Sequence, residues 1–408
     1  MKLVVVCPHF APDIAPTGTV MTRIVTELAS RGHELHVITA LPWYREHAIE
    51  DGWGGKLWRT EKTAWGSITR VHPFPGKSKS NLLRRALGFV AFSVLVAWRG
   101  LFAGGAMSRL DGVLAMSPPL TLGLTGRLIT ALRGGRLIFN IQDVFPDAAI
   151  TTGAIRHPLI ISLASWLERV SYRASDSVVV LSDDLAENVR AKVRPRHRDR
   201  VVVIPNFVDT QAIVPSARTT PYRSELGIAD EIVVMYAGNV GFSQSLEMVI
   251  DVARAMPSIT FVINGDGSAR ANLESRARGL ANVKFVGYQP IERLSEVLAT
   301  GDIHLVPLRS GLATVSVPSK TYSIMAAARP VVAAIDPDTE IPRLLERAGA
   351  GVCIRPDDAD ALRGAITSLV ESPDVRATLG NGGRAWVERH ASPSAVAVAY
   401  EGLFAADR

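Results

Sequence analysis

The stretch VVVCPHFAPDIAPTGTVMTRIVTELASRGHELHVIT, residues 4–39, decides which fold the chain adopts. Its first apolar run stops at a proline, which is typical of a strand buried in a parallel sheet. A helix-period segment follows, ends at Gly32 and leads into a second apolar run at Leu35–Ile38. The order strand, helix, strand predicts a βαβ unit at the start of the chain.

The same alternation continues along the chain and pauses once. After a polar segment around Pro215 and Pro221, a second series of apolar runs begins with EIVVMYAGNVG and ends with AGVCIR. We therefore predict an α/β protein with two Rossmann-like, doubly wound domains that face each other across a cleft. The predicted parts are a domain at 1–205, a domain at 206–385 and a helical segment at 386–408 that packs back on the first domain.

The composition is that of a globular protein with an anionic partner. The chain has 408 residues, too many for one ordinary core, of which 47% are hydrophobic and 21% charged. Its net charge of +6 favours nucleic acid, nucleotide, phospholipid or polyprenyl phosphate, but the sequence carries no nucleic-acid-binding motif. Two cysteines, and nine histidines without metal-ligand spacing, favour neither a disulfide framework nor a metal cofactor. We expect a cytosolic chain, because the short apolar start is not typical of a signal peptide.

One segment, KSKSNLLRRALGFVAFSVLVAWRG from residue 77, is basic at first and then strongly apolar. Its uncharged part, Ala86–Trp98, has 13 residues. A helix needs about 20 residues to cross a bilayer. The segment is therefore either a buried helix of the first domain or an interfacial helix, and the second alternative predicts peripheral membrane contact through residues 77–103. The basic residues that would face anionic headgroups are Lys77, Lys79, Arg84 and Arg85.

Two candidate residues follow strands of the predicted first domain. Gly18 precedes a helix, where backbone N–H groups could bind an anion, although a turn glycine would give the same pattern. Asp143 follows the apolar run RLIFNI and would point into the crevice at the end of the sheet, where it could orient or deprotonate a hydroxyl. Capping of the next helix is the alternative role for Asp143.

Small and polar residues follow neighbouring strands of the predicted second domain. The pattern after EIVVMYA is G-x-x-G rather than G-x-G-x-x-G, which disfavours a nicotinamide cofactor. Glycines at these strand ends would let a flat or phosphorylated ligand reach the backbone. The residues are Gly238, Asn239, Gly265, Asp266, Gly267 and Tyr288.

The stretch VPSKTYSIMAAARPVVA, residues 317–333, predicts a helix with a lysine at its start. Pro318 suits a helix boundary, and Ser319 and Lys320 follow it. A helix N-terminus carries roughly half a positive charge and the lysine adds a full one, a combination that suits a diphosphate. An exposed lysine without a ligand is the alternative, since no G-x-x-x-x-G-K motif precedes it.

Six segments now form an ordered set: FAPDIAPTGTVMTRIVTELASRGHELHVIT, VVVIPNFVDT, VVMYAGNVG, FVINGDGSARANLE, NVKFVGY and VPSKTYSIMAAARPVVAAI. Together they resemble family-4 retaining glycosyltransferases of the GT-B fold, and the resemblance covers nearly the whole chain. The nearest kin are of the bacterial envelope-polysaccharide type, which includes fucosaminyl- and N-acetylaminosugar-transferring enzymes. By this resemblance, Gly18 lies near the donor diphosphate and Asp143 contacts the donor sugar or the acceptor hydroxyl. Tyr288 matches the position that contacts the base, and Glu340 matches an acid that follows the next strand in many relatives.

The chain departs from this family at four positions. Asn239 and Gln244 stand where the family often has an arginine and a lysine. Ser316 and Ser323 stand, by the resemblance, in place of two glutamates that the family has in this segment. The departures leave Lys320 as the best remaining counter-charge for a diphosphate.

The resemblance implies a retaining, metal-independent transfer of a sugar, with N-acetylated sugars among the candidates. The donor would be a UDP-linked sugar, and the acceptor a lipid-linked or saccharide molecule of cell-envelope polysaccharide biosynthesis. Asp143 and Lys320 would be the catalytic residues, and no cofactor beyond the nucleotide sugar is expected. The enzyme would work in the cytoplasm, peripheral to the inner face of the cell membrane. Two alternatives stay open: a nucleotide-sugar 2-epimerase, and a non-catalytic protein that binds a nucleotide sugar or a glycan.

Overall fold

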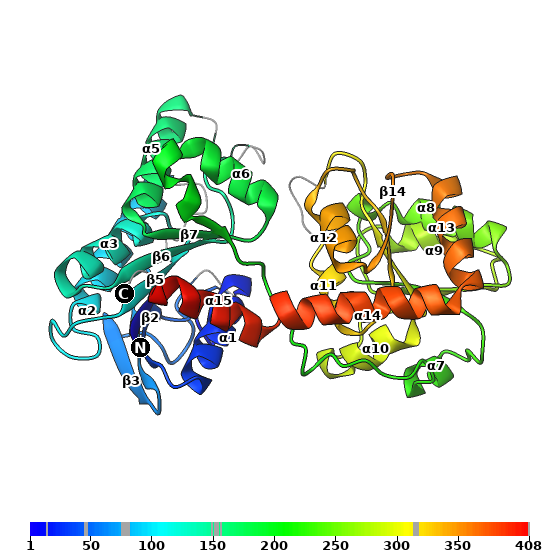
Figure 1. Cartoon of the computed structure of the whole chain (residues 1–408), viewed down its shortest axis with the longest axis horizontal. Helices are drawn as coiled ribbons and strands as arrows, with labels where there is room; N and C mark the ends of the chain where they lie inside the picture. The colour runs from blue at the N-terminus through cyan, green and yellow to red at the C-terminus, as the bar shows by residue number, and fades with distance from the viewer. Residues whose placement is uncertain are drawn as a thin grey trace. The chain divides into compact units, whose positions relative to one another are not determined.

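The computed structural model folds into two compact units (Figure 1). It describes residues 1–13, 15–44, 48–74, 82–147, 150, 155, 157–312 and 318–406, with the backbone alone for 82–86. Unit 1 consists of Met1–Asn206 with Val396–Arg408, and unit 2 of Phe207–Ala395. Residues 386–395, which the sequence assigned to a segment packing on the first domain, thus belong to unit 2.

Unit 1 is built on an eight-stranded sheet of order β3-β4-β2-β1-β5-β6-β7-β8. Its strands are β1 (Lys2–Val6), β2 (Glu34–Ala40), β3 (Trp58–Thr63), β4 (Gly66–Val71), β5 (Gly112–Ser117), β6 (Arg136–Ile141), β7 (Ser177–Val180) and β8 (Val201–Val203). β1 pairs in parallel with β2, so the predicted βαβ unit is confirmed. The sequence did not predict β3 and β4, which form an antiparallel pair at one edge.

Helices cover both faces of this sheet (Figure 1). They are α1 (Pro16–Ser30), α2 (Leu82–Gly100), α3 (Thr121–Arg133), α5 (Pro158–Ala174), α6 (Asp183–Lys192) and α15 (Pro393–Ala405), with a short 3-10 helix, η1 (Pro195–Arg200). Adjacent residues of one strand point to opposite faces. In β5, Gly112 faces Phe404 of α15, whereas Val113 faces Gly126 of α3. α15 and α3 therefore lie on opposite faces of the sheet, and α15 pairs with the end of α1 through Arg31 and Glu401, 2.7 Å apart.

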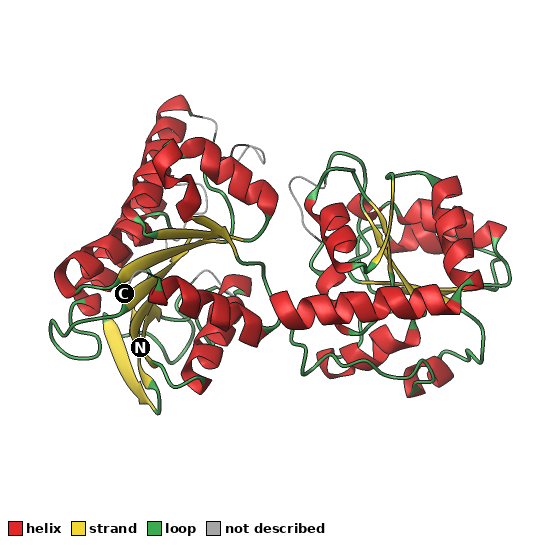
Figure 2. Ribbon diagram, viewed as in Figure 1, coloured by secondary structure: helices red, strands yellow, loops and turns green. Residues whose placement is uncertain are grey.

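Unit 2 is a six-stranded parallel sheet of order β11-β10-β9-β12-β13-β14. The strands are β9 (Val233–Ala237), β10 (Thr260–Asn264), β11 (Val283–Val286), β12 (Ile303–Pro307), β13 (Val331–Ala334) and β14 (Gly351–Ile354). In both units the strands lie between helices (Figure 2), so the predicted pair of doubly wound sheets is confirmed. The strand order of unit 2 reverses between β9 and β12, and a ligand crevice is expected beyond the carboxyl ends of strands at such a point.

The helices of unit 2 connect its strands and flank the sheet. They are α7 (Pro221–Glu225), α8 (Leu246–Ala255), α9 (Arg270–Arg276), α10 (Leu294–Thr300), α11 (Lys320–Ala326), α12 (Glu340–Ala348), α13 (Ala359–Glu371) and α14 (Pro373–His390). Two 3-10 helices, η2 (Phe242–Gln244) and η3 (Ile291–Arg293), stand just before α8 and α10. The start of α11 at Lys320 agrees with the helix that the stretch 317–333 predicts.

The apolar segment that the sequence singled out forms helix α2. Phe92 and Val96 are buried in the core of unit 1, whereas Leu87, Val90 and Val94 are exposed. The helix therefore has a buried side, as the first sequence alternative predicts, and an exposed apolar side, so that membrane contact stays a prediction. Among the described residues, no helix is both long and apolar enough to cross a membrane.

Replacing Phe404 tests how far unit 1 depends on the end of the chain. Phe404 is fully buried against Gly112. We expect Phe404→Ala to lower the free energy of unfolding of unit 1 by about 3–5 kcal/mol, because the cavity left behind cannot close fully. Val398→Ala on the same helix, where the side chain is 48% exposed, should change it by less than about 0.5 kcal/mol. Urea denaturation followed by circular dichroism measures both, and equal losses would contradict the packing of α15 on the sheet.

Candidate functional site

Two glycine loops meet where β9 and β10 end. The backbone N–H of Gly238 donates to the Asn264 carbonyl at 2.9 Å, and that of Val240 donates to the Asp266 carbonyl, also at 2.9 Å. Gly265 has a φ of +151°, and a β-carbon there would collide with the carbonyl oxygen of Gly238. Only glycine allows this approach, so backbone rather than side chains forms this part of the site.

Lys320 extends from the start of α11 toward the end of β9. Its Nζ donates to the hydroxyl of Tyr236 at 2.7 Å and lies 3.9 Å from the centroid of the same ring. The Tyr236 hydroxyl donates in turn to the carbonyl of Asn239. Glycine is favoured at 238 as well, since its φ is +143° and a β-carbon there would lie 3.0 Å from Lys320 Nζ.

The ammonium of Lys320 is poorly compensated. No carboxylate in the described part of the chain forms an ion pair with it, and burial lowers the pKa of Lys320 to about 7. Burial likewise raises the pKa of Tyr236, so the phenol stays neutral and contributes no negative charge. A buried cation without a counter-charge is costly, and an anionic ligand would remove that cost.

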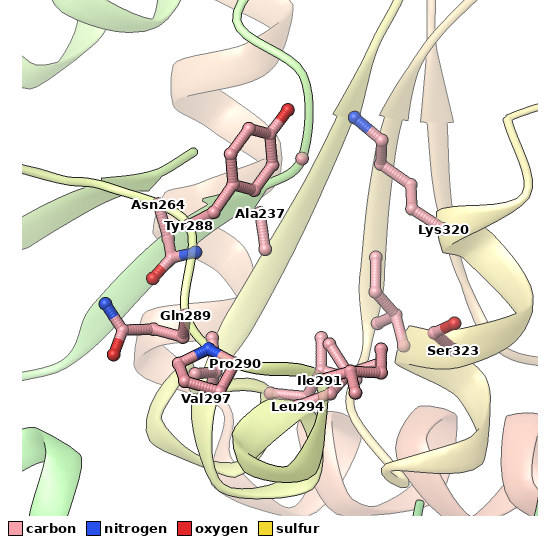
Figure 3. A pocket seen from close by; sticks show the side chains of 13 residues that line it. Ala237, Asn264, Tyr288, Gln289, Pro290, Ile291, Leu294, Val297, Lys320 and Ser323 are labelled. Atoms are coloured by element: carbon pink, nitrogen blue, oxygen red, sulfur yellow. The ribbon is translucent and has the colours of Figure 1, made fainter. Parts of the chain in front are cut away.

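A cavity of about 200 Å³ lies beside Lys320 at the ends of the strands. Figure 3 shows Lys320 and Ser323 on one side of it, and Tyr288, which follows β11, on the other. Apolar side chains around η3 and α10, among them Ile291 and Leu294, form its floor. An ammonium near exposed backbone, an aromatic ring and apolar walls could hold a ligand that has both an anionic and a flat ring part.

The structure brings most of the predicted residues of unit 2 together. Gly238, Tyr288, Lys320 and Ser323 line the cavity. The other strand-end residues, namely Asn239, Gly265, Asp266 and Gly267, form the two adjoining loops. Asp266 also accepts a hydrogen bond on its carbonyl from the Tyr288 hydroxyl at 3.2 Å.

Other predicted residues have different positions. Gln244 Oε1 accepts from the Gly241 N–H at 3.0 Å, so this side chain holds its own loop. Pro318 and Ser319 directly precede Lys320, and the Ser319 side chain does not cap α11. Ser316 lies outside the described residues.

Glu340 does not line the cavity. It is buried at the start of α12, where its Oε1 accepts from Arg347 at 3.1 Å. The sequence placed Glu340 after a strand end. In the structure its carboxylate binds Arg347 of the same helix.

The sequence missed Arg309, which follows β12. Its Nη2 lies 3.0 Å from each carboxylate oxygen of Glu247, and its Nε donates to the Phe242 carbonyl. The guanidinium of Arg309 therefore lies beside the loop after β9. Asn239 and Gln244 in that loop carry no positive charge, and Glu247 balances the charge of Arg309. The available signal was its position just after the apolar run IHLVP.

In unit 1, the two predicted residues lie near strand ends. Gly18 is in the first turn of α1, and a β-carbon there would lie 2.9 Å from His9 Cβ, so the helix start presses against the loop after β1. Asp143 lies just beyond β6, and its side chain is exposed. No described residue forms a hydrogen bond or ion pair with the Asp143 carboxylate, which leaves it open to a ligand.

A second group at strand ends of unit 1 was missed. His9 Nδ1 lies 2.7 Å from Asp13 Oδ2, and the His9 ring stacks on Trp43 with centroids 5.6 Å apart. Tyr44 meets the same ring edge-on at 5.4 Å. Aromatic faces next to a carboxylate and an imidazole suit a polyhydroxylated ligand. The signal was that His9 and Trp43 follow two adjacent strands, β1 and β2.

Comparisons with known proteins identify two families along the chain. Residues 17–206 match the glycosyl transferase 4-like domain, and residues 231–372 match the glycosyl transferases group 1 domain. The chain is 28% identical over 387 residues to the putative colanic acid biosynthesis glycosyl transferase WcaI of Escherichia coli K12, which covers 91% of this chain and 93% of the relative.

Two solved structures share the fold over nearly their whole length. Sucrose-phosphate synthase from Thermosynechococcus elongatus superposes with a TM-score of 0.69 at 16% identity and covers all of both chains. Anabaena Alr3699/HepE in complex with UDP superposes with a TM-score of 0.64 at 15% identity and covers 98% of each chain. At such identities the likeness extends to the fold alone.

The close approach of the two glycine loops can be tested directly. We expect Gly265→Ala to destabilise unit 2 by about 2 kcal/mol or more, because its β-carbon would collide with the Gly238 carbonyl at an unfavourable φ. Gly364→Ala in α13 is the matched control, since no atom lies within 4 Å of its β-carbon. That control should stabilise the helix by about 0.5–1 kcal/mol. Thermal denaturation compares the two variants, and an unchanged Gly265→Ala protein would show that the loops do not pack as described.

Proposed function

The chain carries the two domains of a GT-B glycosyltransferase, and from this premise we propose that it transfers a sugar from a UDP-linked donor during assembly of an envelope polysaccharide. The acceptor in this proposal is lipid-linked or a saccharide. The similarity to WcaI, whose name refers to colanic acid biosynthesis, supports the pathway. The UDP complex of the structural neighbour HepE supports the nucleotide.

The observation that carries the proposal is the desolvated ammonium of Lys320, which lies beside the backbone of Gly238 and which no described carboxylate compensates. We propose that the donor diphosphate binds there and forms with Lys320 an ion pair that no carboxylate of the described residues forms. Tyr288, across the cavity, would then contact the base. Because the negative charge on the diphosphate increases as it leaves, the same ammonium would bind the transition state more tightly than the ground state.

The reaction in this proposal retains the anomeric configuration and needs no metal. The bond between the anomeric carbon and the diphosphate oxygen breaks, and the acceptor oxygen forms its bond on the same face. The acceptor proton passes to the departing diphosphate oxygen, so no protein nucleophile is needed. Asp143, exposed at the end of β6, would orient the acceptor hydroxyl or contact the donor sugar. We expect this reaction at the cytoplasmic face of the membrane, with residues 77–103 among the peripheral contacts.

The first test removes the ammonium and follows its titration. We expect Lys320→Met to weaken UDP-glucose binding by about tenfold or more, because a diphosphate would lose its nearest cation. In the unmodified protein the affinity should fall as the pH rises above about 7, because Lys320 loses its proton there unless the ligand holds it. The fall should reach up to about tenfold per pH unit and should be absent from Lys320→Met.

Titration calorimetry with UDP and UDP-glucose between pH 6 and pH 9, roughly spanning the titration range, measures both effects. Lys284→Met is the control, since Lys284 is on β11 and does not line the cavity. An affinity for UDP that survives in Lys320→Met would remove the clamp from the proposal.

The second test separates acceptor chemistry from donor binding. We expect Asp143→Asn to reduce kcat by about 100-fold or more and to leave UDP affinity nearly unchanged, because the side chain would act on a hydroxyl rather than on the diphosphate. A thermal-shift panel of nucleotide sugars first selects the donor. Release of UDP with a membrane lipid extract as acceptor source then gives the turnover.

Asp199→Asn, in the 3-10 helix before β8, is the control and should behave like the unmodified protein. Equal losses of turnover and UDP affinity in Asp143→Asn would show that Asp143 contacts the donor rather than the acceptor hydroxyl. Conversion of the donor without any acceptor would favour a 2-epimerase instead, and binding without turnover would favour a non-catalytic protein.

A further inference from the structure

Helix α2 exposes an apolar stripe along its outer side. From residue 87 to its end, the residues classed as exposed are Leu87, Val90, Val94 and Trp98. Their spacing of three, four and four residues puts them on one side of the helix. A surface helix of a globular protein usually has charged and polar residues on this side. The outer side of α2 therefore lacks the polar residues that would suit contact with water.

Helices α3 and α5 continue this stripe into a wider surface. α3 packs against α2 on one side and α5 on the other, on the same face of the unit 1 sheet (Figure 1). On α5, the side chains of Leu159, Leu163 and Trp166 are 74%, 65% and 54% exposed. On α3, Leu128 and Leu132 are about half exposed. We name the exposed side chains of α2, α3 and α5 together the apolar helical face. Large contiguous apolar surfaces of this kind mark sites that another apolar phase or molecule covers.

The charges on these helices are almost all positive. The sequence gives three arginines to α2, two to α3 and two to α5, and a single acid, Glu168. Glu168 is buried and accepts from Lys192 at 2.8 Å, so it does not reach the surface. Of the seven arginines, Arg127 and Arg173 are exposed, whereas Arg133 is buried and donates to the carbonyls of Ser108 and Gly100. The apolar helical face therefore combines exposed leucine and tryptophan with positive charge, and it has no acid among the exposed residues of these helices that the structure describes.

This charge pattern distinguishes between two possible occupants. A second copy of the chain would meet the face through a twofold axis, and arginines would then oppose arginines without a carboxylate between them. A bilayer with anionic phospholipids offers the complement, with phosphates for the arginines and an apolar interior for the leucines. Tryptophan is enriched at the headgroup level, which suits Trp98 and Trp166.

We propose that the apolar helical face is a membrane-docking surface for bilayers that contain anionic phospholipids. α2, α3 and α5 would lie along the bilayer surface, with their leucines and tryptophans at the boundary between headgroups and acyl chains. The surface extends beyond residues 77–103 to two further helices of unit 1. The proposal concerns lipid binding only and does not rest on the proposed sugar transfer.

Sedimentation of the full chain with lipid vesicles tests the proposal. The protein should bind vesicles of phosphatidylcholine mixed with phosphatidylglycerol, and bind less to phosphatidylcholine alone or in high salt. The double variant Leu163→Glu/Trp166→Glu should lower the partition coefficient by about tenfold or more, because it replaces apolar contacts with repulsive charges. Val398→Glu is the matched control: Val398 is 48% exposed on α15, which covers the opposite face of the sheet.

Val94→Glu in α2 is a second, independent variant in case the α5 variant does not fold, which circular dichroism shows. Binding to UDP should be the same in all these proteins, so a failure here is separate from a failure of the proposed transfer. Three results would overturn the proposal. They are the absence of binding to anionic vesicles, equal binding by the folded face variants and the unmodified protein, and a solution dimer that the face variants dissociate while vesicle binding is absent.

Discussion

The site of unit 2 depends on one interaction, the contact of the Lys320 ammonium with Tyr236, which no carboxylate in the described part of the chain accompanies. Desolvation makes the charged form of Lys320 costly, and a tyrosine hydroxyl and ring compensate only part of that cost. The backbone next to this contact favours glycine at 238, because its φ of +143° is one that residues with a side chain rarely adopt. The packing of the two glycine loops and this desolvated lysine together define the site of unit 2.

Much of the fold is readable from the sequence, because buried parallel strands are short, continuous apolar runs. Every run that the sequence singled out as a strand of unit 2 is one, from β9 to β14. The edge strand β3 and its neighbour β4 were not predicted, because polar residues interrupt them: β3 reads WRTEKT and is partly exposed along its length. The sequence also did not predict which side of the helix at Ala86–Trp98 is buried, since a single sequence does not show which side of an apolar helix its neighbours cover.

The site was predictable where a residue's role follows from its position at a strand end. Lys320, Gly238 and Tyr288 come together for that reason, since parallel strands end at one edge. Side-chain direction was not predictable: Glu340 turns to Arg347. Arg309 was missed because its place beside the loop after β9 depends on the pairing of strands far apart in sequence.

The assignment of α15 to unit 1 has a consequence for how the protein is made. The chain leaves unit 1 at Asn206, forms all of unit 2 and returns at Val396. Tyr400, which accepts from Asn140 at 2.6 Å, and Phe404 both fill one face of the first sheet. Because α15 follows unit 2 in the chain, all residues of unit 2 are synthesised before the helix that completes this face of unit 1. The first sheet to be synthesised is therefore the later of the two to receive its full cover of helices.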